Sequence, residues 1–172
     1  SDRKDKLLKM LEKIGTQFYT APAATSYHSA FNGGLVYHTL TVVKNMLEIC
    51  QIWYSDVSKE SVVIVSLTHD LGKCVTTKGE DVYIQYESEW HREKLGKMYE
   101  MNPKIRDGLT HAQRSVRLLY YFGIDLTDEE YLSILAHDFL YADENIVFKN
   151  KLNKLGYMLH WSDVKAAWLD EK

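Results

Sequence analysis

Apolar residues recur every three or four positions along most of the chain, which predicts helices. The first such stretch contains Leu7, Leu11, Ile14 and Phe18. A polar loop with Pro22 and two glycines follows it over 20–34. A long second helix is expected from Leu35, with an apolar stripe of Leu35, Val42, Met46, Ile49 and Trp53.

Further helices are expected in the rest of the chain. A third begins near Lys59, is apolar on most sides and ends at 69–73. Helical patterning resumes over 89–95, breaks near 102–103, and returns over 110–122 and again after Thr127, which forms a capping-box signature with Glu130. A last helix contains Leu152, Leu155, Leu159, Ala166 and Leu169. Strands are expected only near 76–86, as one small β-hairpin.

These elements predict one all-α domain over residues 1–172, a compact helical bundle with a small hairpin insertion. A chain of 172 residues can bury a core without disulfides. No apolar run reaches the roughly 18 residues that a membrane span needs, and the charged N-terminus does not resemble a signal peptide. Cys50 and Cys74 are too few for a disulfide framework, so a reducing, cytoplasmic location is expected.

The distribution of charge bears on the partners of the protein. A net charge of −3 argues against a protein that wraps long nucleic acid. The segment 92–117 is nevertheless basic, because it contains only three acidic residues and seven basic ones: Arg92, Lys94, Lys97, Lys104, Arg106, Arg114 and Arg117. This segment is either a solvated helix surface or a patch that faces phosphate. The sequence is also compatible with a homo-oligomer.

Four polar residues occupy positions where an apolar side chain is expected. His38 lies on the stripe of the second helix, Asp163 continues the stripe of the last helix, and His69 and Asp70 close the apolar third helix. Singly, each could be a hydrogen-bonded core residue or a helix cap. If their helices converge, the four form a nitrogen and oxygen site suited to Mn, Fe, Zn, Co or Mg.

The spacing of these residues resembles the HD-domain superfamily of metal-dependent phosphohydrolases. The matching segments are Gly-Gly-Leu-Val-Tyr-His-Thr at 33–39, His-Asp-Leu-Gly-Lys at 69–73 and Leu-His-Trp-Ser-Asp at 159–163. The likeness covers about 18–167, and the segments 19–28, 114–119 and 126–130 are similar to bacterial and phage HD hydrolases. It implies an HD-domain bundle in which a divalent metal ion is held by His38, His69, Asp70 and Asp163.

The resemblance leaves two questions about metal ligands open. Alternatives for the last ligand are Asp125, Asp138 and Asp143, but Asp163 is preferred because it lies on an apolar stripe and follows Leu159-His160. Some family members bind a second metal through histidines between the doublet and the final Asp. Here His111 and His137 could do so, with Asp70 as a bridge. Their flanking residues lack the Gly-His and His-His pairs of the two-metal phosphodiesterases, so one metal is the preferred expectation.

Candidate catalytic and substrate-binding residues surround this ligand set. Asp70 and Lys73 are expected in catalysis, with Lys73 contacting phosphate or serving only as an exposed charge at a helix end. The guanidinium groups of Arg92 and Arg114 suit phosphate. Some HD nucleotidases use a Glu shortly after the doublet, but position 73 holds Lys, so the acid–base role stays open between His28, Glu89, His91 and Glu93.

Aromatic residues and chain size complete the expected function. Trp90 or Tyr27 could stack on a base, His28 could also contact substrate, and either aromatic could instead belong to a core. The expected activity is hydrolysis of a phosphate ester or anhydride of a small nucleotide, of the nucleotidase or nucleoside triphosphohydrolase type. The alternatives are a phosphodiesterase or 3'-5' exonuclease on cyclic or short oligonucleotides, and a non-catalytic nucleotide-binding module.

Overall fold

The computed structural model describes residues 2–26, 28–53, 56–139 and 143–171, and most of these residues are helical, as the sequence predicted. The helices in chain order are α1 (Asp2–Lys13), α2 (Gly15–Thr20), α3 (Gly34–Ile52), α4 (Lys59–Thr68), α5 (Glu89–Leu95), α6 (His111–Tyr121), α7 (Asp128–Leu135) and α8 (Lys154–Lys165). Short turns of other helix types are η1 (Leu71–Lys73), η3 (Asp143–Phe148) and η4 (Ala166–Asp170).

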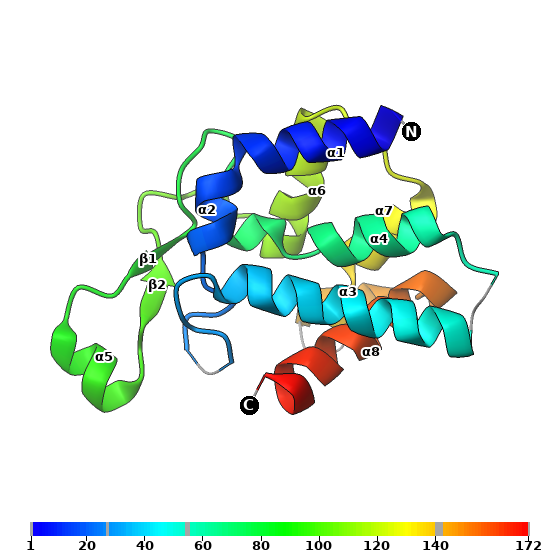
Figure 1. Cartoon of the computed structure of the whole chain (residues 1–172). Coiled ribbons are helices and arrows are strands. Elements are labelled where there is room, and N and C mark those ends of the chain that lie inside the picture. The colour runs from blue at the N-terminus through cyan, green and yellow to red at the C-terminus, as the bar shows by residue number, and fades with distance from the viewer. Residues whose placement is uncertain (1, 27, 54–55, 140–142, 172) are drawn as a thin grey trace.

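The centre of the bundle is formed by α3, α4, α7 and α8. In Figure 1, α3 and α4 run side by side in opposite directions, α1 lies above them and α8 crosses below α3. Most residues of the apolar stripes face this centre, where the fully buried side chains include Leu35, Val42, Met46, Val65 and Leu159. The expected stripe residues Trp53 and Leu169 are instead exposed. The alignment of apolar residues at helical spacing therefore explains which face of each helix is buried.

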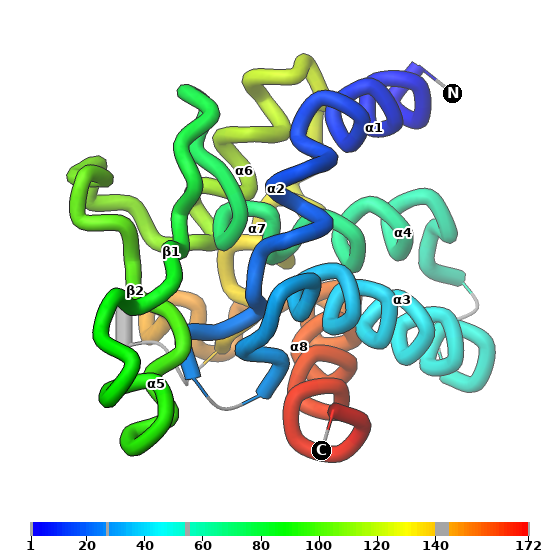
Figure 2. The backbone as a smooth tube through the Cα atoms, turned by 60° about the vertical axis from the view of Figure 1, so that its left-hand side comes forward, coloured from blue at the N-terminus to red at the C-terminus, as the bar shows by residue number. Residues whose placement is uncertain are grey.

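The small sheet differs from the expected hairpin in its pairing. Strand β1 (Tyr83–Gln85) pairs antiparallel with β2 (Tyr99–Met101), and α5 lies between them in the chain. At the start of the expected hairpin, a turn brings Val75, just before it, opposite Asp81 in one isolated bridge. The alternating apolar residues predicted β1. They did not predict its partner β2, because α5, which begins after its N-cap Ser88, lies between the two strands in the chain. Figure 2 shows that β1, α5 and β2 (residues 83–101) form an arm that extends from the bundle.

The ends of three helices refine the expected boundaries. The first predicted helix is broken near Ile14 into α1 and α2, and the last continues past α8 as the wider turn η4. The capping box of α7 is confirmed, because Thr127 and Glu130 exchange hydrogen bonds of 3.2 and 2.9 Å. Buried Glu130 also accepts a hydrogen bond from Arg3 at 2.7 Å and so joins α7 to α1.

None of the described helices is long and apolar enough to cross a membrane.

A close contact between η1 and α6 positions the segment that follows α4. The Ser115 hydroxyl accepts a hydrogen bond from the Gly72 N–H at 2.8 Å and donates one to the His69 carbonyl at 2.6 Å. A Cβ at Gly72 would lie 2.0 Å from the His111 carbonyl oxygen and 2.8 Å from the Ser115 nitrogen. Glycine is required here because both atoms belong to the backbone of α6, which cannot move aside alone.

Substitution Gly72→Ala should lower the free energy of unfolding by about 1–3 kcal/mol, because the new methyl group must push η1 away from α6. Urea denaturation followed by circular dichroism measures this change. Gly15→Ala is the matched control, since its Cβ would meet only the Tyr19 ring at 3.6 Å and should be tolerated. Equal unfolding midpoints for the two variants would contradict the argument.

Candidate metal centre

The structure brings the four predicted ligands together from separate elements. His38 Nε2 on α3 lies 2.9 Å from Asp163 Oδ1 on α8 and 3.6 Å from Asp70 Oδ2. His69 Nε2, directly after α4, lies 3.5 Å from Asp70 Oδ2 and 3.9 Å from Asp163 Oδ1. The side chains of His38, His69 and Asp70 are at most 1% exposed, whereas that of Asp163 is 18% exposed. The cluster is thus a buried site with one open edge.

Hydrogen bonds to the Nδ1 atoms determine how these imidazoles present their other nitrogen. His38 Nδ1 donates to Glu171 Oε1 at 2.7 Å, and His69 Nδ1 donates to the Ser66 carbonyl at 3.0 Å. Both partners can only accept, so the proton must be on Nδ1. A neutral ring then carries its lone pair on Nε2, and metal-binding histidines are commonly oriented in this way by an acceptor at the other ring nitrogen.

The donor set fits a divalent cation, because three of its buried atoms lack a hydrogen-bond partner in the described part of the chain. The described residues offer no hydrogen bond of normal geometry to His38 Nε2, His69 Nε2 or Asp70 Oδ1. Each would be costly to bury in this state, and imidazole lone pairs facing carboxylate oxygens repel one another. A proton or a metal ion between them removes both costs. Two imidazole nitrogens with two carboxylates are ligands that Mn, Fe, Zn and Co accept.

A second cluster lies on the other side of the Asp70 carboxylate. Asp70 Oδ1 is 3.4 Å from Nε2 of both His111 and His137. Asp138 completes the group, with one oxygen 3.2 Å from His111 Nε2 and the other 3.7 Å from His137 Nε2. His137 Nδ1 donates to the Ile134 carbonyl at 2.8 Å, so its Nε2 also points at Asp70. Asp70 thus lies between two groups of residues that could each hold a metal ion, whereas the flanking sequence favoured one metal.

Lys73 lies inside the first cluster. Its ammonium is 2.7 Å from Asp70 Oδ2, and the side chain is only 15% exposed. Burial lowers the pKa of Lys73, but the Asp70 and Asp163 carboxylates outweigh it and raise that pKa. The interpretation of Lys73 as an exposed charge at a helix end is therefore wrong, and the residue is a permanent positive charge beside the candidate metal ligands.

The other predicted site residues are distributed over three regions. The His28 ring is half-buried and lies 5.8 Å from the His38 ring, at the cluster. The Arg114 side chain is 6% exposed and forms a two-pronged ion pair with Asp107 at 2.8 and 3.0 Å. Arg92 donates to the Glu87 carbonyl at 3.0 Å within the arm. The arm also carries four residues on α5, Glu89, Trp90, His91 and Glu93.

Most of the candidate catalytic and substrate-binding residues that do not lie at the cluster are therefore in the arm. Trp90 is 58% exposed and packs against the neighbouring His91 ring, and α5 projects away from the bundle in Figure 1. Among the alternative ligands, Asp125 lies in the loop before α7, and its carbonyl faces Arg3 at 3.4 Å. Tyr27 and the Asp143 side chain lie outside the described part of the chain.

Sequence reasoning missed Glu171, and it assigned Asp138 only as an alternative to Asp163. Asp138 directly follows His137, so a second His-Asp doublet was visible in the sequence. Glu171 lies beyond the last helix and has no periodic or motif signal. Its role became visible only from its contact with His38.

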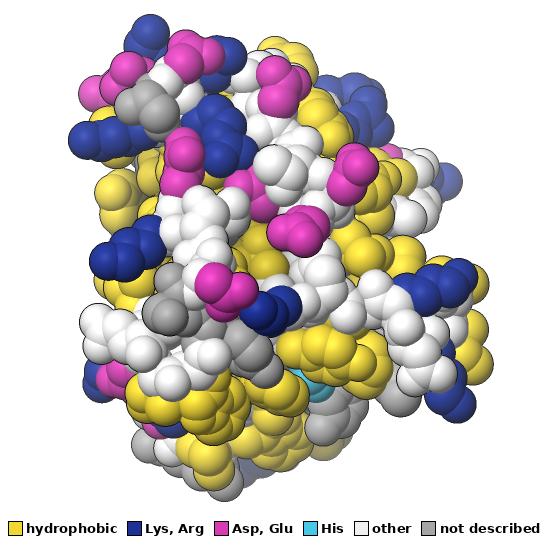
Figure 3. Space-filling view, turned by 90° about the vertical axis from the view of Figure 1, so that its right-hand side faces the viewer, with side chains coloured by type: hydrophobic (Ala, Val, Ile, Leu, Met, Phe, Trp, Pro, Cys, Tyr) yellow, Lys and Arg dark blue, Asp and Glu magenta, His cyan; other side chains and the backbone are white. Residues whose placement is uncertain are grey.

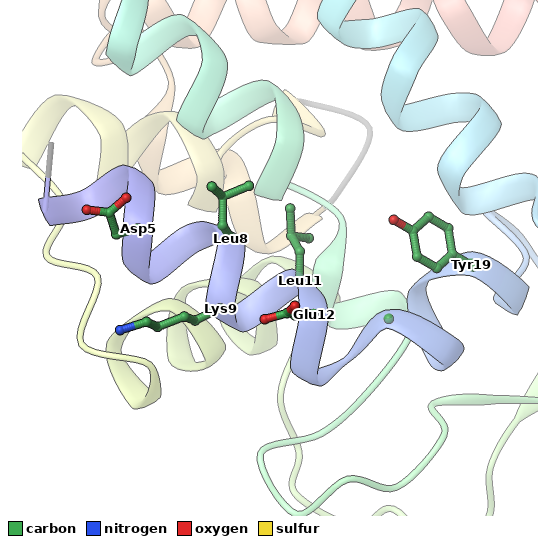
Figure 4. Close-up of a pocket in the computed structure, with 7 residues that line it drawn as sticks. Asp5, Leu8, Lys9, Leu11, Glu12 and Tyr19 are labelled. Carbon is green, nitrogen blue, oxygen red and sulfur yellow. The ribbon is translucent and has the colours of Figure 1, made fainter.

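Two surface features lie apart from the cluster. A hollow of about 790 Å³ is lined by α1 and α2, and Figure 4 shows that its labelled side chains include no histidine. At the end of α3, exposed Trp53 packs edge-on against Trp161 of α8 at 5.9 Å. Figure 3 shows the face at that end of α3, where hydrophobic side chains gather below a region of mixed charge. Among the described residues, the groups of histidine and carboxylate side chains close enough together to hold a metal ion all lie at the cluster.

Comparisons with known protein families, curated proteins and solved structures found no match to this chain. The assignment of a function therefore depends on the geometry of the site and on the motifs.

Burial and carboxylates act in opposite directions on the pKa values of the imidazoles. Burial lowers the pKa of His38, but the adjacent Asp163 and Glu171 carboxylates outweigh it and raise the pKa to about 10. For His69 burial dominates and lowers the pKa to about 4. Burial also lowers the pKa of His137, but nearby carboxylates, that of Asp138 first, raise it to about 9. Near neutral pH, protons on His38 and His137 therefore occupy positions that a metal would take.

Metal binding should release protons and strengthen as the pH rises from about 6 to about 9. Below their raised pKa values, His38 and His137 each carry a proton that a cation must displace. The apparent affinity should increase by up to about tenfold per pH unit for each displaced proton. Calorimetric titration with Mn²⁺ in buffers of different ionisation enthalpy counts the released protons. An affinity independent of pH over this range would exclude the proposed competition.

Proposed function

We propose that the protein is a metal-dependent phosphohydrolase that cleaves a phosphate ester or anhydride of a nucleotide. The observation that carries the proposal is the convergence of His38 and His69 Nε2 on the carboxylates of Asp70 and Asp163, in a buried position that a cation would satisfy. The resemblance of the segments around these residues to HD-domain hydrolases supports the same reaction class.

The residues of the chain divide into those that hold the centre and those that face the substrate. When bound, divalent ions would supply Lewis-acid stabilisation of phosphoryl oxygens and acidify an attacking water molecule. Lys73 adds a fixed positive charge beside Asp70, which favours a phosphate group over a neutral ligand. Asp163, His111 and Asp138 are 18%, 23% and 31% exposed and form the open edge where a substrate would approach.

His28 is the acid–base candidate that the geometry supports best. Of the four residues considered for this role, His28 contacts the His38 ring, whereas Glu89, His91 and Glu93 lie on α5. Burial lowers the pKa of His28, and the nearby charges of His38 and Lys73 lower it further. A neutral imidazole at this half-exposed position is suited to exchanging a proton with a leaving group or water.

A second candidate function is the hydrolysis of phosphodiesters in cyclic or short oligonucleotides. The specific observation is the cluster of His111, His137 and Asp138 on Asp70 Oδ1. A carboxylate that bridges two cations is typical of two-metal sites, which stabilise the attacking and the leaving oxygen together. Nucleotide binding without turnover remains the third alternative, and the same experiments address it.

Substitution Asp70→Ala should abolish turnover while the fold is retained, because it removes the carboxylate shared by both clusters. The assay is a panel of nucleoside mono- and triphosphates and model phosphodiesters with Mn, Co, Zn and Mg. The matched control is Asp5→Ala, an exposed carboxylate of α1, which should keep full activity. Binding of nucleotides by the wild type without turnover of any substrate would favour the non-catalytic module, and full activity of Asp70→Ala would rule out the mechanism.

Substitution His111→Ala distinguishes the two hydrolytic functions. Loss of this ligand should reduce bound metal from two ions to one per chain and suppress diester turnover more strongly than monoester turnover. Elemental analysis and the same substrate panel measure both effects. His91→Ala on α5 serves as the control histidine. If His111→Ala keeps its metal content and its ratio of diester to monoester activity, the second cluster has no such role.

A further inference from the structure

The chain segment after α8 lies next to the cluster of candidate metal ligands. After α8, the turn η4 leads to Glu171, and Figures 1 and 2 show this end of the chain below α3 and beside the loop that precedes it. Two contacts hold the segment on α3: Asn45 Nδ2 donates to Asp170 Oδ2 at 2.9 Å, and Lys165 Nζ donates to Asn45 Oδ1 at 2.8 Å. Ala166 is fully buried in the same interface. The backbone before Glu171 is therefore fixed.

The Glu171 carboxylate joins two parts of the site. Oε1 accepts the hydrogen bond from His38 Nδ1 at 2.7 Å, and Oε2 accepts one from the Ser29 hydroxyl at 2.5 Å. The Glu171 side chain is 0% exposed, so its charge must be balanced by these donors. Ser29 belongs to the loop that carries His28, and it adopts a left-handed backbone with φ of 49°. One carboxylate thus contacts both a metal ligand and the loop beside it.

We infer that Glu171 is a positioning residue that holds His38 in its metal-binding orientation and fixes the His28 loop against it. This inference rests on the proposed metal centre. A carboxylate can only accept, so it keeps the proton on His38 Nδ1 and leaves Nε2 directed at Asp163 and Asp70. Outer partners of this kind change metal affinity by about 10–100-fold when removed.

The test uses Glu171→Gln, which keeps the size of the side chain but replaces an obligate acceptor with a group that can also donate. Mn²⁺ affinity, measured by calorimetry, should fall by about 10–100-fold. The His38 Nδ1–H proton, shifted far downfield by a carboxylate acceptor, should move upfield in the NMR spectrum of the metal-free protein. This second readout depends on neither metal binding nor turnover. A role limited to holding the end of the chain would not move this signal.

Two further variants separate the contacts of Glu171. Ser29→Ala removes the bond to the loop and leaves the bond to His38, so the downfield signal should persist and the affinity should fall less than in Glu171→Gln. Glu48→Gln makes the same change of charge at an exposed position of α3 and should match the wild type in both measurements. Circular dichroism of each variant checks that it is folded.

The outcomes distinguish this inference from the proposed function. If the wild type binds Mn²⁺ and Glu171→Gln binds it equally well with an unchanged His38 signal, the positioning role is wrong while the metal centre stands. If the wild type binds no divalent metal, the proposed function fails and the positioning role fails with it. Weaker binding together with loss of the downfield signal in Glu171→Gln, but not in Glu48→Gln, supports the inference.

Discussion

The buried carboxylate of Asp70 is the constraint around which the site is organised. A carboxylate that is 1% exposed cannot remain charged unless positive or hydrogen-bonding groups surround it closely. Its Oδ2 faces the imidazoles of His38 and His69, and its Oδ1 faces those of His111 and His137. Each oxygen thus faces its own pair of imidazole nitrogens, and Lys73 Nζ donates a hydrogen bond to Oδ2 at 2.7 Å. This division explains how one residue can belong to two adjacent clusters.

The backbone around this carboxylate explains why the two clusters keep a common geometry. Asp70 lies between the end of α4 and η1, and Ser115 of α6 bonds to residues on both sides of it, His69 and Gly72. The His111 carbonyl oxygen lies 3.0 Å from the same hydroxyl. A movement of α6 would therefore shift a ligand of the second cluster and the Asp70 backbone together. The packing of α6 against the segment after α4 therefore couples the positions of the two clusters.

The sequence predicted features that repeat locally and missed those that depend on distant contacts. Apolar periodicity identified the helices, and the same pattern exposed His38 and Asp163 as polar residues on buried stripes. The partner of β1 was not predictable, because α5 separates the two strands in the chain. Arg114 looked available for phosphate, but Asp107 occupies its guanidinium. Pairings of this kind leave no periodic trace, so the sequence cannot reveal them.

The balance of charge in the cluster relates the number of bound cations to substrate binding. Four carboxylates, those of Asp70, Asp138, Asp163 and Glu171, and the single ammonium of Lys73 give a net charge of three negative units when the imidazoles are neutral. With neutral imidazoles, one divalent cation would leave the site with one negative unit of charge, and two would give it one positive unit; a proton kept on His137 in the one-cation state would make the site neutral. A phosphate group carries negative charge, so electrostatic attraction would favour it most in the two-cation state. Asp138 and the second cluster would then set substrate affinity as well as chemistry.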